Sequence, residues 1–178
     1  MKGKQRACRE CGADARVVRK DYRFLESGLD NVILKDIEVR VCGKCKSEAP
    51  RIPDHDDLME TIAVALIDKP SELTGPEIRF LRKHLDAGSE QFARMLGVDR
   101  SHLSRIENGA LAVSRQTDRL VRTLALVHDT GLIAKMKHLG KDRAIISRLS
   151  EIQSEQHRIQ VHVGRQGSGY TYNLDAAA

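Results

Sequence analysis

Four cysteines in two closely spaced pairs are the residues of this sequence best suited to chemistry. Cys8 and Cys11 form one C-x-x-C pair, and Cys42 and Cys45 form the other. Two residues between the members of a pair let one tight turn aim both sulfurs at a metal ion about 2.3 Å away, as in tetrahedral zinc sites. The pattern therefore predicts one structural zinc ion per chain, bound by all four cysteines.

Such cysteines have three other uses. Disulfides are disfavoured because no export signal precedes the first pair, and thiols that stay in the cytoplasm remain reduced. A redox dithiol is typical of a C-x-x-C that opens a helix in a βαβ unit, whereas these pairs close a β-rich segment. A catalytic zinc ion needs an open coordination position, and four sulfur ligands leave none.

The segment between the cysteine pairs has the composition of a small β-rich module. Residues 15–24 and 31–42 predict two strands, because apolar and charged side chains alternate along them. A module of about 45 residues with so little apolar surface is hard to stabilise unaided. Structural zinc binding contributes roughly 10 to 16 kcal/mol in peptides. We therefore expect a zinc-binding β module over residues 1–50.

A second stretch with chemical potential is LGVDRSHLSRIENG, residues 96–109. It follows a predicted helix that carries Ile78, Leu81 and Leu85 at helical spacing and that we expect to end at Gly88. Ser89 is then an N-cap for a second short helix, and Gly97 permits a left-handed turn. A third helix starts at about residue 99 or 100 and stops at residue 109. Two short helices joined by such a turn predict a helix-turn-helix within residues 76–130.

The outward positions of the third helix are small or basic, and every side chain there can donate a hydrogen bond. Residues near the start of a recognition helix enter the major groove, where the arginine fork matches guanine. The predicted base-reading residues are Arg100, Ser101, His102 and Arg105. The predicted phosphate contacts are Ser89, Gln91, Arg94, Ser104, Asn108 and Arg115. The alternative is a helical scaffold whose polar face is merely solvated.

Composition sets broader limits on the protein. The 178 residues include no Trp, three Phe and three Tyr, so the core must be largely aliphatic. A net charge of +5 is a weak argument for a polyanionic partner. No apolar run is long enough for a membrane span, which predicts a cytoplasmic protein without membrane partners. No nucleophile, phosphate-loop or paired-carboxylate motif is present, so we expect no enzymatic activity and no catalytic residues.

The remaining segments complete an α+β multidomain layout. The acidic residues 51–75 predict a linker with a short helix near residues 56–67, whose DHDD run we expect to be solvated rather than metal-binding. Residues 131–156 predict further helices that belong to the core or form a dimer seam. Alternating apolar side chains over residues 157–178 predict a β-hairpin, with GRQGSG as its turn rather than a phosphate loop.

The stretch GSEQFARMLGVDRSHLSRIENG resembles the Xre family of helix-turn-helix proteins, and SRIENG is its most specific part. Together with CRECG and VRVCGKCK, residues 8 to about 128 are similar to the MqsA (YgiT-type) antitoxins, which join an N-terminal zinc module to an Xre domain. The resemblance implies a homodimer formed through the DNA-binding half and a palindromic operator in the protein's own promoter. It also implies base reading at Ser101 and Arg105, and in many members a toxin bound by the zinc module.

This chain departs from that family by continuing for about fifty residues after the Xre helices. Our leading hypothesis is a dimeric, sequence-specific DNA-binding repressor that autoregulates as the antitoxin of a toxin–antitoxin pair. The alternatives are a stand-alone zinc-containing Xre-family regulator and a toxin-neutralising interaction module whose DNA binding is secondary.

Overall fold

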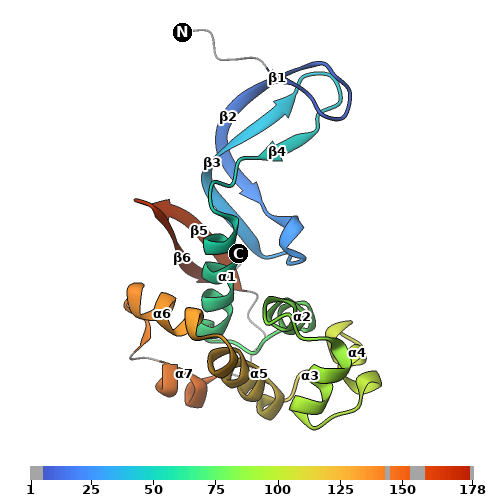
Figure 1. Ribbon diagram of the computed structural model, residues 1–178, viewed down its shortest axis with the longest axis vertical. Helices are drawn as coiled ribbons and strands as arrows, with labels where there is room; N and C mark the ends of the chain where they lie inside the picture. Colours follow the sequence, from blue (N-terminus) through green and yellow to red (C-terminus); the bar gives the residue numbers. More distant parts are fainter. Residues whose placement is uncertain (1–5, 143–144, 153–158, 177–178) are drawn as a thin grey trace.

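The computed structural model describes residues 6–142, 145–152 and 159–176, drawn in colour in Figure 1. The parts of the predicted segments that fall at 1–5, 143–144, 153–158 and 177–178 lie outside the described residues. A β-rich region with the four cysteines comes first, helices follow, and a C-terminal hairpin ends the described chain. The predicted fold class is thus confirmed.

One mixed sheet contains every strand that the structure describes. Its order is β1-β2-β3-β5-β6, and β4 pairs with the other part of β3. All pairs are antiparallel except β3 with β5. The strand bounds are β1 Arg6–Ala7, β2 Asp14–Arg23, β3 Val32–Cys42, β4 Glu48–Pro50, β5 Ile159–Gln166 and β6 Gly169–Ala176.

The C-terminal hairpin continues the sheet that the N-terminal strands begin. The parallel register joins Val32 to Val161 and Leu34 to Val163, and all four side chains are buried. The turn of the hairpin is Gly167 and Ser168, within GRQGSG as expected, and Gly167 lies in the left-handed region at φ 62°; the other residues of GRQGSG are already paired in β5 and β6. Strands far apart in the sequence therefore bury one another's apolar faces, which the alternation along each strand alone does not reveal.

Helix α1, His55–Asp68, runs through the centre of the molecule (Figure 1). It begins where the sequence analysis placed a helix, with the Asp54 side chain accepting a hydrogen bond from the Asp57 amide at 3.1 Å. Leu58, Ile62 and Leu66 are fully buried, and α1 packs against β5, β6, α2 and α6. The helix in the acidic segment is thus a central element of the core.

The start of α1 is divided between solvent and core. Asp54 and Asp56 are exposed, as expected of the DHDD run, and the His55 side chain is also largely exposed. Asp57 instead forms an ion pair with Lys135 and accepts a hydrogen bond from the Tyr170 amide at 2.7 Å. This carboxylate joins α1 to α6 and β6.

The other helices surround the lower end of α1 (Figure 1). Their bounds are α2 Gly75–His84, α3 Ser89–Leu96, α4 Arg100–Glu107, α5 Arg115–His128, α6 Thr130–His138 and α7 Ile145–Glu151. Leu132 and Met136 of α6 lie in the main core, whereas Ile133 is exposed. The side chains of Ile145 and Ile146 lie outside the described residues, Leu149 is half-buried and Ile152 is buried. Helix α6 therefore contributes to the core.

Buried polar contacts attach the helices to the sheet. The Asn31 side chain donates to Glu77 of α2 at 3.0 Å and to the Ile159 carbonyl at 2.9 Å, and Glu77 also pairs with Lys69 at 2.5 Å. Because a buried polar group must find partners, these bonds fix how α2 meets the sheet. Arg122 of α5 is likewise buried and donates to the carbonyls of Ile67, Lys69 and Ser71.

Within the described residues, none of the helices has the length and apolar character to cross a membrane.

Candidate metal centre and nucleic-acid interface

The four cysteines meet beside β1 and the end of β3. In Figure 1 this end of the sheet lies away from α3 and α4. Cys8 Sγ lies 3.6 Å from Cys45 Sγ, Cys11 Sγ lies 3.5 Å from Cys42 Sγ, and all four sulfurs lie within 4.8 Å of one another. Sulfurs placed tetrahedrally around a metal ion at about 2.3 Å would be separated by roughly 3.8 Å. The donor set and its spacing therefore fit a four-coordinate metal ion.

Two tight turns bring these sulfurs together. In the first, the Cys8 amide donates to the Ala13 carbonyl at 2.7 Å and the Gly12 amide donates to the Cys8 carbonyl at 2.9 Å. In the second, the Cys42 amide donates to the Ser47 carbonyl at 3.0 Å. Because β2 and β3 pair up to Ala15 and Cys42, the sheet register sets the two turns opposite each other.

Ser47 tunes the thiols beside it. Its hydroxyl lies 3.2 Å from the sulfurs of both Cys8 and Cys45. That hydroxyl, helped by backbone amides, lowers the pKa of Cys8 to about 6 and holds the pKa of Cys45 below its usual range. Since thiolates are the metal-binding form, Ser47 favours metal binding by Cys8 and Cys45. Although a hydrogen bond with the Ala13 backbone lowers the pKa of Cys11, hydrogen bonds with the neighbouring thiols outweigh it and raise that pKa to about 12. The sequence analysis did not single out Ser47.

Helices α3 and α4 form the predicted helix-turn-helix. Helix α3 ends at Gly97, which has φ 70°, and the next amide, that of Val98, donates back to the Ala93 carbonyl at 3.0 Å. Asp99 caps α4 by accepting from the His102 amide at 2.7 Å. Two expected boundaries differ: α2 ends at His84, followed by a left-handed Asp86, and Gly88 is the N-cap of α3 with Ser89 as its first residue.

The outward face of α4 is open to solvent. The predicted base-reading residues Arg100, Ser101, His102 and Arg105 are all exposed. Their side chains form no hydrogen bond or ion pair with another residue among those the structure describes. Leu103 and Ile106, on the opposite side of the helix, are buried in the main core. The amphipathic pattern of α4 thus leaves one polar strip available to a partner.

The predicted phosphate-contact residues are spread over three helices. Gln91 and Arg94 are exposed on α3, Ser104 on α4 and Arg115 at the start of α5, and Ser89 is half-buried. Arg115 lies 3.8 Å from Glu72, which is a long ion pair. Asn108 is exposed, but its side chain already has partners. The side-chain nitrogen donates to the Ser104 hydroxyl at 3.3 Å, and the side-chain oxygen accepts from Arg79.

A buried acidic residue fixes the C-terminal end of α4. Glu107 accepts from the Arg82 side chain at 2.6 and 3.1 Å and pairs with Arg79 at 3.4 Å. Gly75 stands so close to α4 that a Cβ on it would lie 2.2 Å from the Ile106 carbonyl oxygen. Sequence reasoning missed Arg79, Arg82 and Gly75, because their role depends on how α2 and α4 approach each other.

Residues 78–127, which run from α2 into α5, match a helix-turn-helix protein family. No curated protein and no solved structure matches the chain significantly. Together with the geometry of α3 and α4, the family match shows that this segment is a helix-turn-helix unit of the Xre type, which supports a DNA-binding function for the protein.

Proposed function

We propose that this protein is a sequence-specific DNA-binding repressor that inserts α4 into the major groove. The observation that carries the proposal is the exposed polar strip of Arg100, Ser101, His102 and Arg105 on a helix whose other side is buried. An arginine fork can bind both acceptors of guanine, and the N-terminal residues of a recognition helix reach base edges. Ser89, Gln91, Arg94, Ser104, Asn108 and Arg115 would position the helix through phosphates.

A dimer would present two copies of α4 to a palindromic operator, about 34 to 36 Å apart. The apolar surface on α5 supports self-association, because Leu120 is 37 % exposed and Val127 is 68 % exposed. Residues seven apart lie on the same side of a helix, so these two side chains give α5 one small exposed apolar strip. We infer that this face lies at or near the dimer axis.

In the same proposal the four-cysteine cluster holds a structural zinc ion. Tetrahedral four-sulfur coordination is characteristic of structural zinc, and it leaves no position for substrate. The zinc ion would stabilise the end of the sheet, where Cys8, Ala15 and Cys42 form only a small apolar cluster of their own. Metal analysis of the purified protein tests this directly, with one zinc ion per chain as the expected result.

The finer role that we propose is an autoregulating antitoxin. It is supported by the order of a four-cysteine module before an Xre-type unit and by the resemblance of residues 8 to about 128 to MqsA-type chains. The alternative is a stand-alone regulator, favoured by the C-terminal hairpin that pairs with β3 and makes this chain different from that family. Expression of the adjacent gene with and without this protein separates the two roles. If the product of that gene arrests growth, only an antitoxin would relieve the arrest.

The DNA-binding proposal is tested by footprinting the purified protein on the DNA upstream of its own gene. We expect protection of two symmetric half-sites whose centres are one or more helical turns apart. Protection of a single half-site would contradict the dimer. Protection that is equally strong on unrelated DNA at physiological salt would contradict sequence-specific reading.

A further inference from the structure

A pocket of about 430 Å³ lies where the sheet is interrupted beside β3. Because β2 pairs along one edge of β3, β4 and β5 share the other edge. β5 reaches residues 32–34 and β4 reaches residues 39–41, which leaves residues 35–38 between them. These four residues line the pocket together with Arg51 and Pro53 after β4 and with Gly164, Arg165 and Tyr170 of the hairpin. We call this pocket the β3 notch.

Cations from four segments of the chain converge on the β3 notch. Those that line it are Arg19, Lys35, Arg51 and Arg165. An adjoining pocket also contains Arg51 and adds Arg40. Arg9 lines that second pocket too, but it follows Cys8 and so lies next to a proposed metal-binding thiolate. Leaving Arg9 aside, five positively charged side chains surround the notch.

Carboxylates offset only part of this charge. The ion pairs present are Arg19 with Asp36 at 2.9 Å, Arg51 with Glu38 at 3.0 Å, and Lys35 with Asp21. Arg40 and Arg165 pair with no acidic residue in the described part of the chain. Asp54, next to Pro53 in the sequence, caps α1 and does not line the notch. Even with Asp54 counted, the positive charges outnumber the negative ones.

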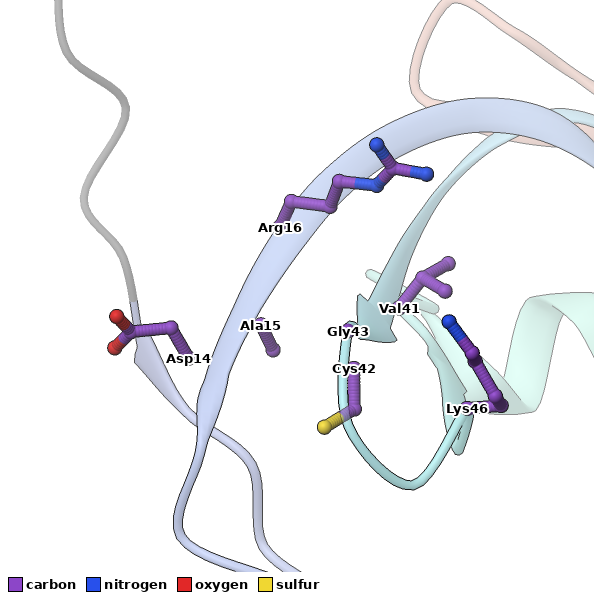
Figure 2. A pocket seen from close by; sticks show the side chains of 7 residues that line it. All are labelled: Asp14, Ala15, Arg16, Val41, Cys42, Gly43 and Lys46. Atoms are coloured by element: carbon purple, nitrogen blue, oxygen red, sulfur yellow. The ribbon is translucent and has the colours of Figure 1, made fainter.

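The pocket beside the cysteine cluster has a different charge balance. Arg16 and Lys46 line it, but Figure 2 shows Asp14 and Cys42 at the same pocket. The carboxylate and the thiolates of the proposed zinc site offset the two cations there. None of the four cysteines lines the β3 notch. The net positive charge of the notch is therefore independent of the metal centre.

A bulge in β3 shapes the floor of the notch. Asp36 has φ 47°, which is rare for a residue other than glycine, and the register with β2 shifts between Lys20 and Tyr22. Successive side chains of a regular strand point to opposite faces, but Lys35 and Asp36 are both exposed. Arg19 donates to the Asp36 carbonyl at 2.6 Å as well as to its carboxylate. The bulge thus holds Arg19 beside the notch.

We propose that the β3 notch binds a small phosphate ester, with the phosphate among the arginines and the organic part against Ile37, Pro53 and Tyr170. Guanidinium groups from β2, from the chain after β4 and from β5 can each form charge-assisted hydrogen bonds to a phosphate dianion, which has more acceptor oxygens than a carboxylate. A volume of about 430 Å³ is in the range of small-molecule sites. The site is separate from α4 and does not depend on DNA binding.

The test titrates the zinc-loaded full-length protein with phenyl phosphate at low salt and follows the backbone amides by ¹H–¹⁵N NMR. Phenylacetate is the matched ligand, because it carries the same ring with a carboxylate in place of the phosphate. We expect saturable shifts centred on residues 35–38, 51 and 164–166, and binding of phenylacetate at least about fivefold weaker. Arg165→Gln should weaken phenyl phosphate binding at least about fivefold, since it removes a charge-assisted hydrogen bond to the ligand. Arg51→Gln should act in the same direction.

Controls separate the notch from the rest of the molecule. Lys137→Gln removes an exposed cation from α6 and should leave phenyl phosphate binding unchanged. Arg105→Ala should lose operator binding but keep phenyl phosphate binding, so that failure of one proposal is distinguishable from failure of the other.

Three results would overturn the inference. The first is the absence of saturable shifts at the notch, or shifts that neither Arg165→Gln nor Arg51→Gln weakens. The second is binding of phenylacetate as tight as that of phenyl phosphate. The third is displacement of phenyl phosphate from Arg105→Ala by random duplex DNA, which would make the notch part of a nucleic-acid backbone surface.

Discussion

Arg105 is the residue on which the proposed base reading depends most. Its side chain is exposed and its backbone carbonyl accepts the Ala110 and Leu111 amides at 2.8 and 3.1 Å, which end α4 at a fixed place. We expect Arg105→Ala to cost about 1 to 3 kcal/mol of operator binding and to relax preference at one base pair per half-site. Competition binding with single-base operator variants measures both effects. Equal loss on specific and random DNA would show that Arg105 contacts only the backbone.

Asp57 should give the stability of the fold a dependence on acid pH. Although burial alone would raise the pKa of this carboxyl group, hydrogen bonds from Lys135 and the Tyr170 amide lower it below its ordinary value. A carboxyl group whose pKa is depressed on folding stabilises the native state above its unfolded pKa of about 3.9. This stabilisation is lost as the pH falls through the lower, folded pKa.

We therefore expect the free energy of unfolding to decrease below about pH 4, and Asp57→Asn to remove part of that decrease. Urea titrations of the wild type and of Asp57→Asn between neutral and acid pH measure the free energy of unfolding of each protein. Asp56→Asn is the control, because the Asp56 side chain is fully exposed. A decrease of the same size in wild type and Asp57→Asn would assign the acid sensitivity to other carboxylates.

At the scale of elements, the close approach of α2 to α4 determines the position of α4, the proposed recognition helix. Gly75→Ala would place a Cβ against the Ile106 carbonyl, and backbone cannot move aside as a flexible side chain can. We expect a loss of about 1 to 3 kcal/mol in stability, because overpacking displaces whole elements. Weaker operator binding should accompany it, because α4 is displaced.

Gly164→Ala is the matched control for this change, since a Cβ there would come no nearer than 4.0 Å to the Lys35 side chain, the backbone has no positive φ, and the residue lies in β5, outside the helix-turn-helix. Thermal unfolding and operator titration of the two variants give the comparison. If both variants behave like the wild type, the contact between α2 and α4 has room to relax and does not position the recognition helix.

For the whole molecule, the cysteine cluster and the main core are separate sources of stability. Cys8, Ala15 and Cys42 form one small apolar cluster, and the helices share another with β3, β5 and β6. We expect removal of the proposed zinc ion with a strong chelator to unfold the end of the sheet and to leave α1 to α6 folded. Hydrogen exchange should then accelerate in residues 7–18 and 40–50 only, with operator binding largely retained. Cooperative loss of helix protection would show that the metal stabilises the whole protein.

The sequence predicted those parts whose signals are local. Cysteine spacing identified the four residues that meet, alternating side chains identified β2, β3 and the hairpin, and helical spacing identified α2 to α4. In each case residues close together in the sequence carry both the propensity for the element or turn and the spacing that identifies it. The outward residues of α4 were also predictable, because an amphipathic helix exposes whichever side its apolar residues leave.

Only the tertiary structure decided how these parts combine. The parallel pairing of Val32 with Val161, the central place of α1 and the bonds from Asn31 to Glu77 and Ile159 join residues up to 129 positions apart. Many partners could satisfy an alternating strand or an apolar helix equally well when only its own residues are considered. The choice among them comes from simultaneous burial and hydrogen bonding of the whole chain, which no single segment encodes.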